Sequence, residues 1–229
     1  MSTTVYSLAI QATYQNLSIA LFRQDVCIGH VAHIHQRASS FLIPHVTALL
    51  SEHGLSLADM RYLAVDCGPG AFTSLRVAIA TVNGIAFASR IPLVPVDSFQ
   101  AIAHEAGSPR VLVLFNAFNS DLYAAYLQDG VIKKAGCVKY EALADFLAEH
   151  ATNEAVTLVG NGVEAYPEAL THALEIFPNL ERSNVAVPDA QSVGACGYAA
   201  WLAGKTVEKV EPYYLKTQNF AIRAPLIKH

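Results

Sequence analysis

Residues 66–76 read Asp-Cys-Gly-Pro-Gly-Ala-Phe-Thr-Ser-Leu-Arg, and this stretch separates two apolar segments of the chain. The segment before it, Tyr62–Asp66, has the length and composition of a buried strand. The segment after it continues to about Ser89 and has the length of a helix. The Gly-Pro-Gly turn permits a sharp change of direction between the two. The pattern therefore predicts a strand, a tight loop and a long helix.

The loop has two interpretations. A helix begins with unpaired N–H groups, and together with the helix dipole these groups bind anions such as phosphate. A plain strand-to-helix turn uses glycines in the same way, simply for backbone freedom. A dinucleotide-binding GxGxxG motif is absent, because Thr73 stands where its third glycine belongs. The candidate phosphate or anion loop consists of Gly68, Gly70, Thr73 and Ser74.

Upstream of the loop, the spacing predicts a three-stranded antiparallel meander followed by a helix. The helix carries apolar residues at helical spacing between Phe41 and Gly54, and Pro44 is expected in its first turn, where a missing N–H costs little. Ser56 and Asp59 have the spacing of a capping box, which predicts a short helical turn. The three expected strands are Val5–Gln11, Leu17–Arg23 and Val26–Ile34.

Downstream of the loop helix, Leu93–Val96 predicts a strand, and Asp97 or Ser98 caps a helix that continues to about Ala106. The pattern then starts again at Gly107-Ser108-Pro109. We expect three strands, a helix, a strand, a helix, a short extended piece and a last helix. These segments are Val111–Phe115, Leu122–Leu127, Val131–Val138, Tyr140–His150, Val156–Val159, Glu164–Leu174, Val185–Pro188 and Ala190–Ala203.

Both halves of the chain show the same order of elements, although no sequence repeat is visible. Three meandering strands followed by alternating helices and strands give a mixed sheet with helices on its faces. Two such units in tandem predict an α/β fold of the duplicated ribonuclease-H-like type, the ASKHA or actin-like ATPase fold. We expect the N-terminal unit at 1–106 and the C-terminal unit at 107–229. The last helix and the tail are candidates for packing back on the first unit.

The composition excludes several classes of function. Hydrophobic residues make up 53% of the 229 residues and charged residues 15%, below the roughly 25% of an average domain. This composition argues against disorder, and a formal net charge of −4 argues against a surface built for nucleic-acid phosphates. The shortage of charge predicts a large surface that is buried against another chain.

The N-terminal stretch lacks the basic start and the cleavage site of a signal peptide. No apolar run approaches the roughly 18 residues that span a bilayer. We therefore expect a cytoplasmic protein that does not enter a membrane. Four cysteines stand far apart, which favours reduced, buried thiols over disulfides or a zinc site. These cysteines are Cys27, Cys67, Cys137 and Cys196.

Three histidines, His30, His33 and His35, lie close together, but too few further ligands are near in the sequence to hold a metal ion. A solvated strand edge explains them, and no metal site is predicted.

The loop helix has two faces. Large apolar residues form one stripe that we expect to pack on the sheet. Ala80, Gly84 and Ala88 recur every fourth residue on the other face and form a smooth ridge, which another helix can approach closely. That second helix belongs either to the same unit or to a partner subunit.

The loop and its surroundings resemble the TsaB family. The block Ala64–Val96 carries the resemblance most specifically, and the likeness covers nearly the whole chain. It implies a two-unit ASKHA-type fold and a subunit without catalysis of its own, which pairs with the catalytic paralogue TsaD. The supporting pieces are Leu8–Ile10, Ser18–Leu21, Gly160–Gly162 and Glu211–Lys216.

The resemblance also implies a function and partners. The chain is expected to be a scaffold and activator that binds the TsaD catalytic subunit for threonylcarbamoyl transfer to adenosine 37 of tRNAs that read ANN codons. A TsaE-like ATPase joins the complex, and tRNA is bound only indirectly through it. We expect a homodimer when the chain is alone and no cofactor on the isolated chain, and a nucleotide at the interface of the complex is left open.

The family pairs through helices of its N-terminal domain, which favours a partner subunit over a helix of the same unit. The helix around Phe41–His53 is the expected neighbour of the ridge. The interface residues implied are Phe41, His45, Leu49, Val77, Ala80, Thr81, Gly84 and Ala88.

Several positions depart from the family patterns. Ser98 and Ile102 stand where the catalytic paralogue has metal-binding histidines, and Ala12 stands where the usual TsaB turn has an acid. At three further positions this chain has another residue than the usual TsaB pattern. It has Ser74 instead of a glycine, Asn116 instead of an aspartate and Phe118 instead of an arginine. These changes remove charge or narrow the backbone options near the cleft between the units, which argues against independent nucleotide chemistry.

Two other functions stay open. The first is an independent ASKHA-fold small-molecule kinase, which Ala12 and Asn116 disfavour because acidic residues would be wanted there. The second is a free-standing homodimeric ligand-binding protein, which fits the composition equally well.

Overall fold

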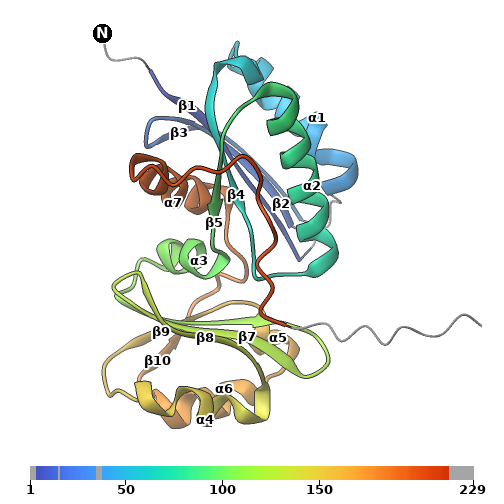
Figure 1. The fold of residues 1–229 in the computed structure, drawn as a ribbon. Helices are drawn as coiled ribbons and strands as arrows, with labels where there is room; N and C mark the ends of the chain where they lie inside the picture. Colours follow the sequence, from blue (N-terminus) through green and yellow to red (C-terminus); the bar gives the residue numbers. More distant parts are fainter. Residues whose placement is uncertain (1–3, 15, 35–37, 217–229) are drawn as a thin grey trace, which may run out of the picture.

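The computed structural model describes residues 4–14, 16–34 and 38–216 of the chain. It contains two five-stranded sheets toward opposite ends of the molecule, with helices packed against each (Figure 1). The strand order is β3-β2-β1-β4-β5 in the first sheet and β10-β9-β6-β7-β8 in the second. Read from its other edge, the second sheet repeats the order of the first, with three antiparallel strands and then two parallel ones. The predicted duplicated α/β architecture is confirmed.

The first half of the chain follows the predicted order closely. A 3-10 turn at Leu57–Asp59 lies where the capping box predicts one, and the Ser56 N–H donates to the Asp59 carboxylate over 2.8 Å. The elements are β1 (Tyr6–Thr13), β2 (Asn16–Arg23), β3 (Val26–Ile34), α1 (Ala38–Glu52), β4 (Met60–Asp66), α2 (Phe72–Ser89), β5 (Leu93–Val96) and α3 (Ser98–Ala106).

The second half repeats this order with shorter helices. The elements are β6 (Arg110–Asn116), β7 (Asp121–Gln128), β8 (Val131–Lys139), α4 (Leu143–Leu147), β9 (Val156–Val159), α5 (Gly162–Ala165), α6 (Glu168–Ile176), β10 (Leu180–Arg182) and α7 (Ala190–Leu202).

Four details differ from the predictions. Pro44 does not lie in the first turn of its helix, because α1 begins at Ala38, whose buried side chain belongs to the core. The helix expected at Tyr140–His150 is α4 with a 3-10 turn at each end. Pro167 interrupts the helix expected at Glu164–Leu174 and divides it into α5 and α6, because proline has no N–H to continue a helix. Strand β10 was not predicted, since only Leu180 among its three residues is apolar.

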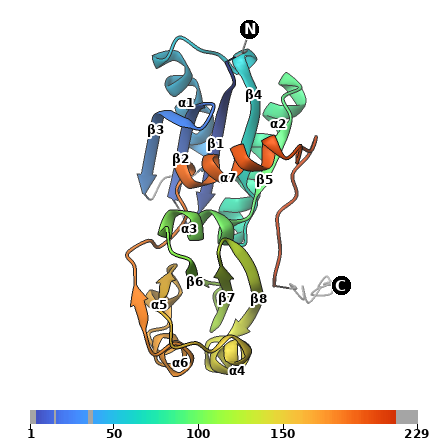
Figure 2. The same cartoon turned by 90° about the vertical axis from the view of Figure 1, so that its left-hand side faces the viewer.

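Each sheet is covered on both faces, and the last helix of each half covers the sheet of the other half. Helices α1 and α2 cover one face of the first sheet and α7 covers its other face. Helices α4 and α6 cover one face of the second sheet, and α3 covers the other with Phe99 and Ile102 in that core. Figure 2 shows α7 lying across the first sheet and α3 at the junction of the two sheets. The last helix packs back on the first unit as expected, whereas the predicted range 1–106 takes no account of α3 covering the second sheet.

Helix α7 lies unusually close to the first sheet. It presents Gly194 and Gly197 to the sheet, and a Cβ on Gly197 would stand 2.5 Å from the Cβ of Ala64. The strands beneath are lined by small residues, Ala9 and Ala20 among them, which belong to the same core cluster as α7. Small residues on both sides are what permit the helix backbone to approach the sheet.

After α7 the chain returns along the first unit as a C-terminal strap, residues 205–216. Val207 pairs with Leu93 at the edge of the first sheet through N–O distances of 2.9 and 2.8 Å. The Asn83 side chain on α2 makes two hydrogen bonds of 2.9 Å with the backbone of Val210. Lys216 then forms an ion pair of 2.5 Å with Asp121 in the second unit. The strap therefore joins α2 to the second unit.

We predict that Gly197→Ala destabilises the fold. The added methyl group would stand 2.5 Å from Ala64 on a central strand, so the helix must move outward. Overpacking of this kind costs about 1–3 kcal/mol. The free energy of unfolding, measured by urea titration, should fall by that amount.

The matched control is Gly84→Ala in α2, where a Cβ would meet no atom within 4 Å. Because alanine is the better helix former, this variant should keep or gain up to about 1 kcal/mol of stability. Equal effects of the two substitutions would show that close approach is not required of α7.

Candidate partner interface and interunit cleft

Helices α1 and α2 lie side by side over one face of the first sheet (Figure 1). The inner residues of α2, such as Leu75, Ile79 and Val82, are buried in the core. Apart from histidine, α1 contains one ionisable residue, Glu52, and α2 contains one, Arg76. The outer surface of this helix pair therefore has almost no charge.

This outer surface instead exposes large apolar side chains. Phe87 is 89% exposed, Ile43 is 50% exposed and Phe41 is 40% exposed. By length and composition alone, the 18-residue α2 with its mean hydropathy of 1.3 could span a membrane, so the expectation that no apolar run is long enough is wrong. Its inner face packs on the sheet, and its outer face is open, since 28% of the helix is buried.

The ridge on α2 faces away from its own unit. Ala80, Gly84 and Ala88 are exposed, and nothing lies within 4 Å of a Cβ placed on Gly84. The alternative in which the ridge packs against a helix of the same unit is therefore wrong. We define the outer face of α1 and α2 by Phe41, Ile43, Ala80, Gly84, Phe87 and Ala88.

The other expected interface residues divide into two groups. His45, Val77 and Thr81 are partly exposed beside the outer face. Leu49 is only 2% exposed, because it belongs to the inward stripe of α1 together with residues such as Leu42. Its inclusion in a partner interface is wrong.

A stack of aromatic rings continues the outer face at α1. The His45 ring lies 4.4 Å from that of His33 on β3 and 5.9 Å from that of Phe41. Partial burial, followed by the neighbouring His33, lowers the pKa of His45. His30 instead forms an ion pair of 2.9 Å with Asp189 at the start of α7. The histidines are thus more than a solvated strand edge, and His35 lies outside the described residues.

The glycine loop is tied down by hydrogen bonds within the protein. Gly68 has φ +101°, a conformation that favours glycine, and its N–H donates to the Asp66 carboxylate over 3.0 Å. Ser98 at the start of α3 donates its hydroxyl to the same carboxylate and its N–H to the Gly68 carbonyl. The strap covers the loop, because the Tyr213 N–H donates to the Cys67 carbonyl over 2.7 Å.

Asp66 is a buried carboxyl group that the sequence analysis did not single out. Burial raises its pKa to about 6, and burial also raises the pKa of nearby Asp97 to about 6. Among the described residues, the second carboxyl oxygen of Asp66 has no hydrogen-bond partner. Burial raises the pKa of the adjacent Cys67 thiol to about 12, so this thiol is a poor nucleophile at neutral pH.

These contacts restrict the candidate anion loop. The N–H of Gly68 is already bonded to Asp66, and Gly70 packs so closely on Thr13 that a Cβ there would lie 2.7 Å from its methyl group. Only Thr73 and Ser74, in the first turn of α2, remain at or near the surface. Binding of an anion by this loop stays a prediction.

Tyr14 closes the space between the two units at the turn between β1 and β2. Its hydroxyl donates to the Asn116 carbonyl over 2.7 Å, and its ring lies 5.9 Å from Phe115 and 6.5 Å from Phe118. Burial raises its pKa well above the usual value. This role was not predicted from the sequence, where the aromatic residues Tyr14 and Phe118 in two expected turns were the available signal.

The positions where acids would be wanted serve the fold instead. Ala12 is 3% exposed in the core of the first unit. The Asn116 side chain accepts the Phe118 N–H over 2.8 Å and so stabilises its own turn. Two other positions noted in the sequence, Ser98 and Ile102, also serve the fold. Ser98 donates a hydrogen bond to Asp66, and Ile102 is buried in the core beneath α3.

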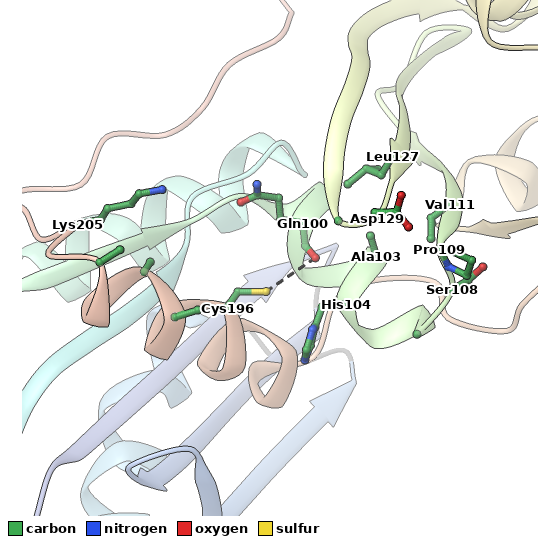
Figure 3. Close-up of a pocket in the computed structure, with 15 residues that line it drawn as sticks. Gln100, Ala103, His104, Ser108, Pro109, Val111, Leu127, Asp129, Cys196 and Lys205 are labelled. Atoms are coloured by element: carbon green, nitrogen blue, oxygen red, sulfur yellow. Dashed lines mark hydrogen bonds between the residues drawn. The ribbon is translucent and has the colours of Figure 1, made fainter.

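A groove lies between α3 and α7 (Figure 3). This groove of about 580 Å³ has a floor of small apolar residues and carries His104, Asp129 and Lys205 among its lining residues. The Cys196 thiol in it lies 3.9 Å from the Gln100 carbonyl, and burial raises the pKa of that thiol to about 11. The thiol is therefore protonated at neutral pH and offers no activated nucleophile.

The sequence matches one protein family over most of its length. The family described as TsaD, tRNA N6-adenosine threonylcarbamoyltransferase, matches residues 29–217. The tRNA threonylcarbamoyladenosine biosynthesis protein TsaB of Escherichia coli is 28% identical over 220 residues, which are 91% of this chain and 94% of that protein.

Solved structures show the same fold. A Pseudomonas aeruginosa protein described as similar to peptidase YEAZ superposes with a TM-score of 0.75 at 26% identity, over 93% of this chain and all of that one. Component A of the (R)-2-hydroxyglutaryl-CoA dehydratase of Acidaminococcus fermentans gives a TM-score of 0.53 at 9% identity, over 87% of this chain and 99% of that one. The second likeness concerns the fold alone.

We predict that Asp66 makes the protein less stable as the pH rises from about 4 to 6. In this window the folded state keeps the carboxyl proton, because the pKa is about 6, while the unfolded state with its pKa of 3.8 loses it. Stability therefore falls as the pH rises and is constant above the folded pKa. The free energy of unfolding of Asp66→Asn should not show this decrease between about pH 4 and 6.

The measurement is urea unfolding of both proteins from pH 4 to 7.5. The difference in the free energy of unfolding between the two proteins should shift in favour of the variant up to about pH 6 and then level off. Asp97 is present in both proteins, so its own titration contributes to both curves. A difference that does not change with pH would contradict the buried, protonated carboxyl.

Proposed function

Because the chain belongs to the tRNA N6-adenosine threonylcarbamoyltransferase family, we propose that it is the non-catalytic, TsaB-type subunit that binds and activates a TsaD-like catalytic subunit. The complex would transfer a threonylcarbamoyl group to adenosine 37 of tRNAs that read ANN codons. A TsaE-like ATPase would join it in the cytoplasm, and tRNA would contact this chain only through the complex.

The observation that carries this proposal is the outer face of α1 and α2. A charge-poor surface that exposes Phe87, Ile43 and Phe41 is costly in water. Aromatic residues on such a patch are typical of the centre of a protein interface. The Escherichia coli relative named above is described as a tRNA threonylcarbamoyladenosine biosynthesis protein, which supports a partner from that pathway.

The shape of the outer face suits a helix of the partner. Ala80, Gly84 and Ala88 leave no side chain beyond a methyl group along one ridge, so two helix backbones can come close together. Without the partner, a second copy of the chain would cover the same face as a homodimer.

The interunit cleft supports a role without catalysis. Tyr14 bridges the two units there, and Ala12 and Asn116 serve the core and a turn. Ser98 and Ile102 stand at the metal-binding positions of the catalytic paralogue. Ser98 is hydrogen-bonded to Asp66, and Ile102 is buried in the core. In this proposal the isolated chain holds no cofactor, and a nucleotide at the interface of the complex is left open.

The kinase alternative predicts ATP turnover by the chain alone. We expect the purified chain to hydrolyse no ATP above a buffer blank, because Tyr14 fills the space between the units. The measurement is phosphate release with magnesium and candidate sugars present. Turnover that remains with the protein through a second purification step would favour the kinase.

We predict that Gly84→Arg abolishes binding to the catalytic subunit. The arginine would hold two helices apart and bury a charge without a partner, at a cost of several kcal/mol. A pull-down with the catalytic subunit measures the loss, and mass spectrometry of tRNA nucleosides should show that threonylcarbamoyladenosine is missing. Light scattering should show a homodimer for the wild type and a monomer for the variant.

The matched control is Thr171→Arg, which places the same residue at an exposed position of α6 in the second unit. It should bind normally, and circular dichroism should show that both variants fold. Normal binding by folded Gly84→Arg would show that the partner does not use the outer face.

A further inference from the structure

Arg76 lies at the end of the ridge, one helical turn before Ala80, and its guanidinium group is held in place by two aromatic side chains. Its central carbon lies 3.7 Å from the centre of the Phe72 ring. Its Nε–H donates to the Tyr214 hydroxyl over 2.6 Å. The strap fixes Tyr214 in turn, because the backbone of Tyr213 and Val210 is bonded to Cys67 and Asn83.

This guanidinium group has no carboxylate partner among the residues that the structure describes. The other charges nearby, Lys209 and Glu211 on the strap, pair with each other over 3.2 Å. Arginine has five N–H donors in a planar fork, and only the Nε–H is used here. The four remaining donors are the ones that bind a carboxylate through two parallel hydrogen bonds.

Arg76 also borders a groove that joins the ridge to the strap. The groove has a volume of about 480 Å³, and the ion-paired Lys209 and Glu211 line it together with apolar side chains. It is continuous with the outer face, since Ala80 belongs to both. The lining residues that matter here are Arg76, Ile79, Ala80, Asn83, Val210 and Tyr214.

We propose that the catalytic subunit places an Asp or Glu carboxylate of its interface helix in this groove, paired with Arg76. The inference rests on the proposed function and adds the chemistry of the partner helix. That helix would carry small residues opposite the ridge and one carboxylate about one helical turn away from those small residues. Arg76 is the single cation of α2, so the pair sets the register and direction of the partner helix. The strap takes part in recognition because Tyr214 orients the guanidinium group.

The test is the affinity of Arg76 variants for the catalytic subunit, measured by calorimetry without nucleotide. Arg76→Gln should weaken binding about thirtyfold or more, because the partner carboxylate would be buried without a cation. Arg76→Lys should lose part of this affinity, since lysine keeps the charge but not the fork. Tyr214→Phe should cause a smaller loss, because it removes only the bond to Nε.

The matched control is Arg182→Gln on β10, an exposed arginine of the second unit, which should leave the affinity unchanged. Arg76→Glu should abolish binding. Changing the correct acid on the partner helix to arginine should then restore it, which identifies the carboxylate directly.

The outcomes separate the inference from the proposed function. If Gly84→Arg abolishes binding while Arg76→Gln stays within twofold of the wild type, the carboxylate pair is wrong and the partner role stands. A loss in Arg76→Gln that appears only when nucleotide is added would show that the group binds phosphate, which also overturns the pair. Normal binding by Gly84→Arg overturns the outer face as the contact surface, whereas no binding by the wild type overturns the proposed function itself.

Discussion

The close approach of α7 to the first sheet is the constraint on which the rest of the arrangement depends. Gly194 and Gly197 allow it, because any side chain at either position would collide with Phe22 or Ala64. With α7 in place, the strap that follows it begins at the edge of the first sheet and lies along α2. The strap then covers the glycine loop, orients Arg76 and reaches Asp121 in the second unit. One helix that two glycines bring close to the sheet thus organises surfaces on both units.

The same arrangement leaves the protein with one face that it cannot cover itself. Both faces of the first sheet are already occupied, one by α1 and α2 and the other by α7. The outer side of α2 therefore has no further layer within the described part of the chain, although it carries one charge and exposes Phe87. In the interunit cleft the situation is reversed, because Tyr14 and the turn at Asn116 fill the space from within. The contrast between an uncovered face and a filled cleft fits a subunit that acts by binding.

Most of the fold could be predicted from local patterns. Strands β3, β5 and β9 begin and end at the predicted residues, because alternating or continuous apolar runs bounded by turn residues define them. Of the two expected capping residues, Asp97 and Ser98, it is Asp97 that caps α3, with its carboxylate accepting two backbone N–H groups. Strand β10 escaped prediction because its place comes from pairing with β9, not from its own composition. The burial of Leu49 also escaped it, since the exposed positions of α1 include large apolar residues such as Phe41 and Ile43 as well as polar ones.

The sequence by itself determined the duplicated α/β architecture, the glycine loop between β4 and α2, and the ridge of small residues, because each is written in residues that are neighbours along the chain or on one helix. Only the tertiary structure decided that α3 covers the second sheet, that Tyr14 fills the cleft, that Asp66 is buried, and that Tyr214 holds Arg76. These features join residues more than thirty or even a hundred positions apart. Their contacts depend on how closely whole layers pack, and this distance is set by side chains from several elements at once.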